Sequence, residues 1–100
     1  MSESQTVMYF PLQPGRQDPW MSTQGKPAGV VLGGNNVPTL MYQCEAAPLL
    51  TKPREIRVIG IGQTVPGDRG LEYAGYCPDP AGGLYHVWIG PPQMDAVLEE

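Results

Sequence analysis

The chain has 100 residues, enough for one ordinary domain, which excludes an enzyme with separate cofactor and substrate domains. Six Lys and Arg against ten Asp and Glu give a formal net charge of −4, and there is no basic run, so direct nucleic-acid binding is not expected. Thirteen glycines and twelve prolines interrupt short apolar clusters, a composition typical of many short strands joined by turns.

The N-terminal quarter predicts one clear strand and one ambiguous segment. Residues 5–12 alternate along an extended segment that a turn at 13–15 closes. Residues 20–24 lie between two proline-containing breaks and form either a short edge strand or a loop.

The clearest predicted hairpin follows. An apolar run at 28–32 stops at Gly33-Gly34-Asn35-Asn36, and a second extended segment occupies 37–45. Gly and Asn accept the positive φ angles of tight hairpin turns. The second arm has a period of two, and one face, expected to be buried, carries Leu40, Tyr42 and Cys44.

Residues 46–53 contain two prolines and no strong pattern, so they predict a connecting loop held down by Leu49 and Leu50. The strongest strand follows at 55–61, before Gly60 and Gly62 break it. In this strand Ile56 and Val58 share one face, while the other face carries Glu55, Arg57 and Ile59.

Two further strands are predicted after an exposed turn at 66–70. In the strand at 71–77, Gly75 marks a bulge or the close approach of another backbone. The last strand covers 84–89 and is ended by Gly90-Pro91-Pro92. Beyond it, residues 93–100 predict either one docked helical turn or a disordered tail.

These elements predict a mostly β protein. We expect a small single-domain antiparallel sandwich or partly open barrel of about six to seven short strands, with at most a short C-terminal helical turn. The single domain covers 1–100, with a β core at 5–90 and a tail at 91–100.

Residues that carry chemistry are scarce. His86 is the only histidine, so a zinc site or a Cys-His nucleophile would need Cys44 or Cys77 to meet it, and neither lies at ligand spacing. The glycines of Gly60-Ile61-Gly62 lack the third glycine and the following helix of a dinucleotide loop. We therefore predict no enzyme activity, no catalytic residue, no metal and no cofactor, and reduced thiols rather than a disulfide framework.

Surface residues are the remaining candidates for function. Eight aromatic residues and five methionines exceed what so small a core holds, and such residues, with Arg, are enriched at protein interfaces. Near the first turn Arg16, Trp20 and Met21 form one candidate interface group, and Trp20 has the alternative of folding back as a lid over the open barrel end. Tyr85 and Trp88 face opposite sides of one strand and complete the candidate interface residues.

From about Val7 to Ile89 the chain resembles a family of uncharacterised small proteins of bacteriophages and prophages. The resemblance rests on the order and spacing of five blocks: YFPL at 9–12, GNNVP at 34–38, IRVIGIG at 56–62 followed by VP at 65–66, YAGY at 73–76 and HV at 86–87. It does not extend to the stretch at 18–20 or to the acidic tail after Gly90. The resemblance implies a phage origin and a β-rich fold, and it assigns no catalytic residue.

We therefore predict a small phage-encoded, non-catalytic binding protein that contacts a host or phage protein or protein complex. Inhibition of a host defence system, in the manner of an anti-CRISPR protein, is its narrower form. The lack of a membrane-length apolar run and of a signal peptide predicts the host bacterial cytoplasm and no membrane contact. Two alternatives stay open: a virion structural or decoration protein that self-associates into a homo-oligomer, and a small-ligand-binding β-barrel whose mouth is lined by Tyr42, Tyr73 and Trp88.

Overall fold

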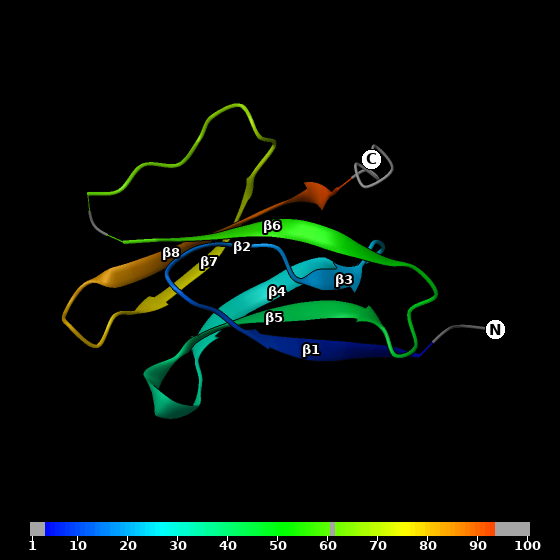
Figure 1. Cartoon of the computed structure of the whole chain (residues 1–100). Coiled ribbons are helices and arrows are strands. Elements are labelled where there is room, and N and C mark those ends of the chain that lie inside the picture. The colour runs from blue at the N-terminus through cyan, green and yellow to red at the C-terminus, as the bar shows by residue number, and fades with distance from the viewer. Residues whose placement is uncertain (1–3, 61, 94–100) are drawn as a thin grey trace.

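The computed structural model describes residues 4–60 and 62–93, which form two antiparallel sheets (Figure 1). The first sheet has the order β1-β5-β4 and consists of β1 (Gln5–Pro11), β4 (Lys26–Leu32) and β5 (Pro38–Glu45). The second has the order β2-β6-β8-β7, with β3 also paired to β6, and consists of β2 (Gly15–Gln17), β3 (Trp20–Ser22), β6 (Thr51–Ile59), β7 (Glu72–Pro78) and β8 (Leu84–Pro92). The protein is therefore a mostly β sandwich, which confirms the predicted fold class.

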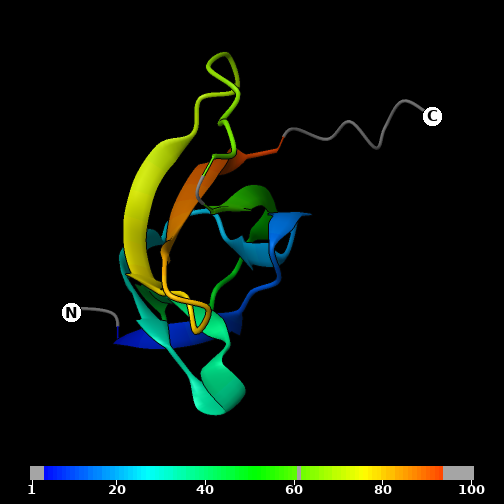
Figure 2. The ribbon, with the colours of Figure 1, turned by 90° about the vertical axis from the view of Figure 1, so that its left-hand side faces the viewer.

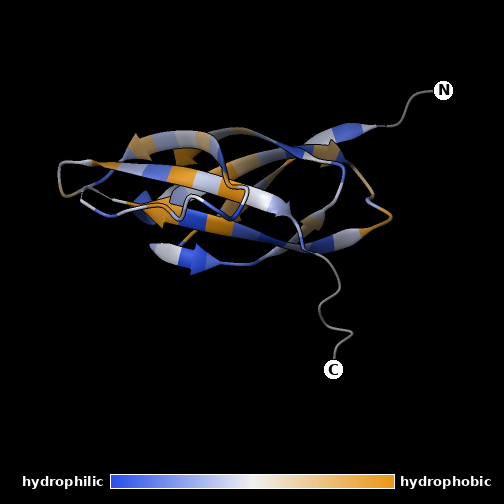
Figure 3. Cartoon of the chain, turned by 90° about the horizontal axis from the view of Figure 1, so that it is seen from above, coloured by the Kyte–Doolittle hydropathy of each residue, from blue (hydrophilic) through white to orange (hydrophobic). Residues whose placement is uncertain are grey.

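The core lies between the two sheets, because each strand turns alternate side chains toward the other sheet. Figure 3 shows this alternation as bands of hydrophilic and hydrophobic colour along the strands. The prediction for β5 is confirmed, since its three inward residues are buried, and the same holds for Ile56 and Val58 of β6. The buried apolar cluster comprises Leu12, Met21, Leu40, Tyr42, Cys44, Ile56, Val58, Val87 and Ile89.

The predicted hairpin joins β4 to β5 through a short 3-10 turn at Gly34–Asn36. Asn35 and Asn36 adopt φ angles of 58° and 59°, the left-handed region that Asn tolerates better than other residues with a Cβ. The Gly33 N–H closes the loop on the Val37 carbonyl at 2.8 Å. The hairpin prediction is thus confirmed.

Several predicted boundaries are wrong. β6 begins at Thr51 inside the predicted loop, because Thr51–Pro53 pairs with β3. Proline has no N–H to donate to a neighbouring strand. Pro53 is tolerated in β6 because its bond next to the end of β8 uses the carbonyl, which accepts from the Gln93 N–H at 2.9 Å. Leu49 and Leu50 do not hold the loop down, since their side chains are 99% and 55% exposed.

The ends of the second sheet also differ from expectation. Gly15, which was predicted to lie in a turn, begins the short strand β2, which pairs antiparallel with β6. β8 continues to Pro92, where Arg54 of β6 is its partner, instead of ending at Gly90. Of the predicted C-terminal helical turn, residues 94–100 lie outside the described part of the chain.

A buried arginine, Arg54, connects the second sheet to the first through hydrogen bonds. Arg54 is 8% exposed and points into the core, where its Nε donates to the Gly90 carbonyl at 2.8 Å and its Nη1 to the Tyr42 hydroxyl at 2.7 Å. The Tyr42 hydroxyl in turn donates to the Ser22 carbonyl. Arg54 thereby ties β6 to β8 and, through Tyr42, to β5 and β3, and its guanidinium lies 5.7 Å from the centre of the Tyr42 ring.

The two sheets meet where β4 lies alongside β7 (Figure 2). The pairing of β7 with β8 shifts register between Tyr73 and Gly75, and Gly75 adopts a φ of 140°. A Cβ at Gly75 would lie 3.2 Å from Val30 Cγ2 and 3.4 Å from the Val30 backbone nitrogen. Both readings predicted for Gly75, a bulge and a close backbone approach, are confirmed.

Replacing Gly75 by alanine should therefore lower the free energy of unfolding by about 1–2 kcal/mol, because the φ is strained for any residue with a Cβ and the added methyl crowds Val30. Urea denaturation measures this loss. Gly82→Ala is the matched control for the cost of the backbone conformation, since Gly82 has a φ of 110° and no atom of the described residues lies within 4 Å of its Cβ position. Equal losses in both variants would show that the contact with Val30 adds no cost.

Candidate interaction surface

The outer face of the five-stranded sheet carries a continuous row of large side chains. In the strand register Arg16 lies opposite Arg57, Arg57 opposite Trp88, and Trp88 opposite Tyr73. One step along, His86 lies opposite Tyr76. This face is the one turned away from Val87 and Ile89, which are buried in the core.

Four rings on β7 and β8 contact one another there, and we call Tyr73, Tyr76, His86 and Trp88 the aromatic patch. The Tyr73 ring lies 5.1 Å from that of Trp88 in an edge-to-face arrangement and 5.7 Å from that of His86. The Tyr76 ring lies 6.0 Å from that of His86 on its other side. The Tyr73 hydroxyl is also 2.7 Å from His86 Nδ1, which fixes the imidazole between the two tyrosines.

The patch is open to solvent although most of its ring surface is apolar. Tyr73 and Tyr76 are 47% and 57% exposed, and His86 and Trp88 are half-buried by their neighbours. Isolated exposed apolar residues are ordinary, but a contiguous group of rings is characteristic of binding surfaces. The patch is therefore the strongest candidate for a functional surface.

Next to the patch, on β6, a buried carboxylate is surrounded by arginines. The Glu55 side chain is 6% exposed; its Oε2 lies 2.5 Å from Arg57 Nε, and its Oε1 lies 2.6 Å from Arg69 Nε. Arg16 Nε is farther from it, at 3.8 Å. Burial disfavours the Glu55 carboxylate, but hydrogen bonds from Arg57 and Arg69 outweigh that effect and lower its pKa below the ordinary value.

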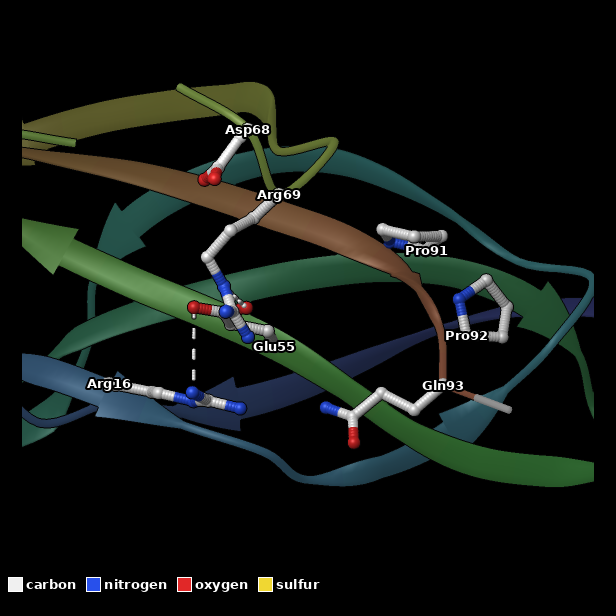
Figure 4. Close-up of a pocket in the computed structure, with 7 residues that line it drawn as sticks. All are labelled: Arg16, Glu55, Asp68, Arg69, Pro91, Pro92 and Gln93. Atoms are coloured by element: carbon white, nitrogen blue, oxygen red, sulfur yellow. Dashed lines mark hydrogen bonds and ion pairs between the residues drawn. The ribbon is translucent and has the colours of Figure 1, made fainter. Parts of the chain in front are cut away.

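A shallow pocket of about 410 Å³ lies over this group (Figure 4). Its charged lining consists of two cations, Arg16 and Arg69, and two carboxylates, Glu55 and Asp68. Arg16 also forms an ion pair with Asp18 at 3.2 Å. Because the charges balance and the arginines are already paired, the pocket has no net preference for an anion or a cation.

The structure separates the predicted interface residues. Trp20 is 65% exposed on β3 and does not fold back as a lid, and Arg16 lies in the charged group beside Glu55. Trp88 belongs to the aromatic patch, whereas Tyr85, on the opposite face of β8, packs against the core. Met21 is 2% exposed, so its predicted place at the surface is corrected: in β3, Trp20 points outward and Met21 inward.

The arrangement of the side chains disagrees with two alternatives that the sequence left open, a barrel mouth and a Cys77–His86 pair. Tyr42 is fully buried between the sheets while Tyr73 and Trp88 lie on an outer face, so these three do not line one barrel mouth. Cys77 is buried on the core side of β7, and its strand partner is Tyr85, whereas His86 faces outward, so this Cys-His pair is not assembled. Within 4–60 and 62–93, no three His, Cys, Asp or Glu side chains are grouped to hold a metal ion.

Sequence reasoning missed the aromatic patch as a unit. Strict alternation along 71–77 places Tyr73 and Tyr76 on opposite faces, because they are three residues apart. The bulge between Tyr73 and Gly75 inserts one extra residue and brings both rings to the outer face. The signal was present in the sequence, since a glycine between two tyrosines in a strand predicts such a bulge.

Comparison with protein-family models, with curated proteins and with solved structures finds no match. No helix in the part of the chain that the structure describes combines the length and the apolar character needed to span a bilayer.

Proposed function

We propose that this protein is a non-catalytic binding protein and that the aromatic patch is the surface with which it contacts a protein partner. The observation that carries the proposal is the contact of four rings on an exposed sheet face. Aromatic side chains supply large contact area at little cost in conformational entropy, which is why they dominate the energetics of protein interfaces.

Charge favours a protein partner over a nucleic acid. Sheets that bind single-stranded nucleic acid combine stacking rings with a positively charged groove. Here the arginines beside the patch are paired with Glu55 and Asp18, and the whole chain carries a net charge of −4. The rings are therefore suited to apolar and edge-to-face contacts with the side chains of a protein. The paired arginines do not form a positively charged groove that would bind phosphates.

The partner we propose is a host or phage protein, encountered in the bacterial cytoplasm. Inhibition of a host defence complex, such as a CRISPR effector, is the narrower form of this proposal. The phage part of the proposal is supported by the resemblance of the sequence to small phage proteins, a family that carries no activity to transfer. The geometry of the patch is compatible with any protein surface that offers apolar or aromatic side chains.

Trp88→Ala should abolish capture of the partner, because it removes the ring that Tyr73 packs against at the centre of the row. Tagged full-length protein is incubated with lysate of phage-infected bacteria, and retained proteins are quantified by mass spectrometry. We expect a protein retained by the wild type at least about tenfold more than by the variant, the loss typical of a hot-spot residue.

Trp20→Ala is the matched control, since Trp20 is an exposed tryptophan of the same sheet that lies outside the patch. Thermal unfolding of all three proteins checks that the variants remain folded. If the wild type and Trp88→Ala retain the same proteins in the same amounts, or if only Trp20→Ala loses them, the patch is not the contact surface.

A further inference from the structure

We propose that β1 is the interface of a homodimer, in which the β1 strands of two copies pair antiparallel about a two-fold axis at Val7. The proposal is independent of the aromatic patch, which lies on the other sheet. β1 forms the border of the three-stranded sheet, and β5 is its only strand partner among the residues described (Figure 1).

The hydrogen bonds of β1 define which backbone groups are free. The Ser4 carbonyl accepts from the Ala46 N–H at 3.0 Å, and the Leu12 N–H donates to the Pro38 carbonyl at 2.8 Å. In an antiparallel ladder the residues bonded to one neighbour alternate with those bonded to the other. The even-numbered residues therefore face β5, and the outward edge presents the N–H and C=O groups of Gln5, Val7 and Tyr9 and the carbonyl of Pro11.

Within the described part of the chain, this edge lacks the features that normally prevent edge strands from pairing with other chains. β1 has the sequence QTVMYFP, seven residues without a charge and with its one proline at the far end. Charged side chains, bulges, early prolines or a covering element are the usual protections. The register of β1 with β5 also runs from Gln5 to Pro11 without a shift, so no bulge twists the edge away.

One inward side chain indicates that the sheet stops one strand short. Met8 lies opposite Tyr42 and on the same face as it, toward the core, yet Met8 is 42% exposed while Tyr42 is fully buried. A further strand beside β1 would cover Met8. Val7 and Tyr9, on the outer face, are 39% and 61% exposed and would gain apolar neighbours from the same strand.

A second copy fits this edge with Val7 on the two-fold axis. With Val7 opposite its counterpart, Gln5 lies opposite Tyr9 of the second copy, so all three free N–H donors of each strand meet carbonyls, two bonds for each residue pair. Thr6 then faces Met8 of the second copy on the core side. A shift by two residues toward the C-terminus would place Pro11 opposite Gln5 and leave a carbonyl without its donor.

Because the two-fold axis places residue 7 against residue 7, a charge exchange tests both the dimer and its register. Sedimentation of the full-length wild type between about 1 and 500 µM should show a mass rising from 10.8 kDa toward twice that value. Val7→Lys and Val7→Glu should each weaken self-association at least about tenfold, and an equimolar mixture of the two should restore it as a heterodimer.

A backbone variant provides the second readout. Val7→Pro removes the central donor of the free edge and leaves the ladder to β5 intact, so it should be a folded monomer. A wild type that stays monomeric up to 500 µM, a dimer that survives Val7→Pro, or a Lys and Glu mixture that fails to associate would each overturn the proposal. If the wild type stays monomeric, a strand of a different protein becomes the alternative occupant of the β1 edge.

Discussion

Replacing Arg54 by methionine should lower the free energy of unfolding by about 2–4 kcal/mol, because two buried partners lose a charged donor at once. Methionine fills a similar length of space, so the loss reports the hydrogen bonds more than a cavity. The Gly90 carbonyl and the Tyr42 hydroxyl, which Arg54 reaches at 2.8 Å and 2.7 Å, would both lose their bond to it. Urea denaturation followed by tryptophan fluorescence measures the change.

Tyr42→Phe is the comparison that separates the partners of Arg54. It removes the hydroxyl, with its bond from Arg54 and its bond to the Ser22 carbonyl, but keeps the ring and the bond from Arg54 to Gly90, so we expect a smaller loss of about 1–2 kcal/mol. An Arg54→Met protein within about 0.5 kcal/mol of the wild type would mean that the relief of the buried charge offsets the lost bonds.

Glu55→Gln should lower the free energy of unfolding at pH 7 by about 1–2 kcal/mol, because the hydrogen bonds from Arg57 and Arg69 lose their charged acceptor while both arginines remain partly solvated. It should also reduce the acid sensitivity of the fold. The folded-state pKa of Glu55 is lowered, so its contribution to stability is fully present above the ordinary value of 4.5 and is lost as the pH falls through the folded-state value. Below pH 4.5 the wild type should therefore lose stability more steeply than the variant. The urea midpoints of both proteins between pH 7 and pH 3 measure this difference.

Glu45→Gln is the control for this prediction. The Glu45 carboxylate accepts a hydrogen bond from the Ser22 hydroxyl at 2.6 Å, which lowers its pKa, but no arginine among the described residues forms an ion pair with it. We expect Glu45→Gln to retain most of the acid sensitivity of the wild type. If Glu55→Gln loses stability in acid as steeply as the wild type, the ion pairs of Glu55 do not control the acid response.

The fold was predictable wherever one strand face is buried. Apolar residues at every second position indicate a strand with one buried face. This pattern is present in β5 at Leu40, Tyr42 and Cys44, and in β6 at Ile56 and Val58. The short strands were predicted less well, because three residues carry no period: β3 lies in the segment for which a short edge strand and a loop were both expected, and β2 was not predicted. β2 and the first residues of β6 form through pairing with distant segments, which the local sequence does not reveal.

The candidate surface was predictable in part. Trp88 was expected on an interface and lies in the aromatic patch, but Met21 was expected beside Trp20 and is buried. Composition indicated that the aromatic residues exceed the core, while their grouping depends on the bulge before Gly75 and on which strands become neighbours. The Glu55 cluster needed the same information, because Arg69 reaches Glu55 from a turn fourteen residues away.

The order of the strands has a consequence for how the chain acquires its structure. The three-stranded sheet uses β1, β4 and β5, and the other sheet uses the segments between and after them. β1 therefore cannot pair until β5, which starts at Pro38, is available. In the same way, β2 and β3 cannot pair until β6, which starts at Thr51, is available. The three-stranded sheet has all its strands once Glu45 is present, whereas the five-stranded sheet is incomplete in any N-terminal fragment that lacks β8 (Leu84–Pro92). Such interleaved, non-local pairing is typical of domains that fold slowly and in a single cooperative transition.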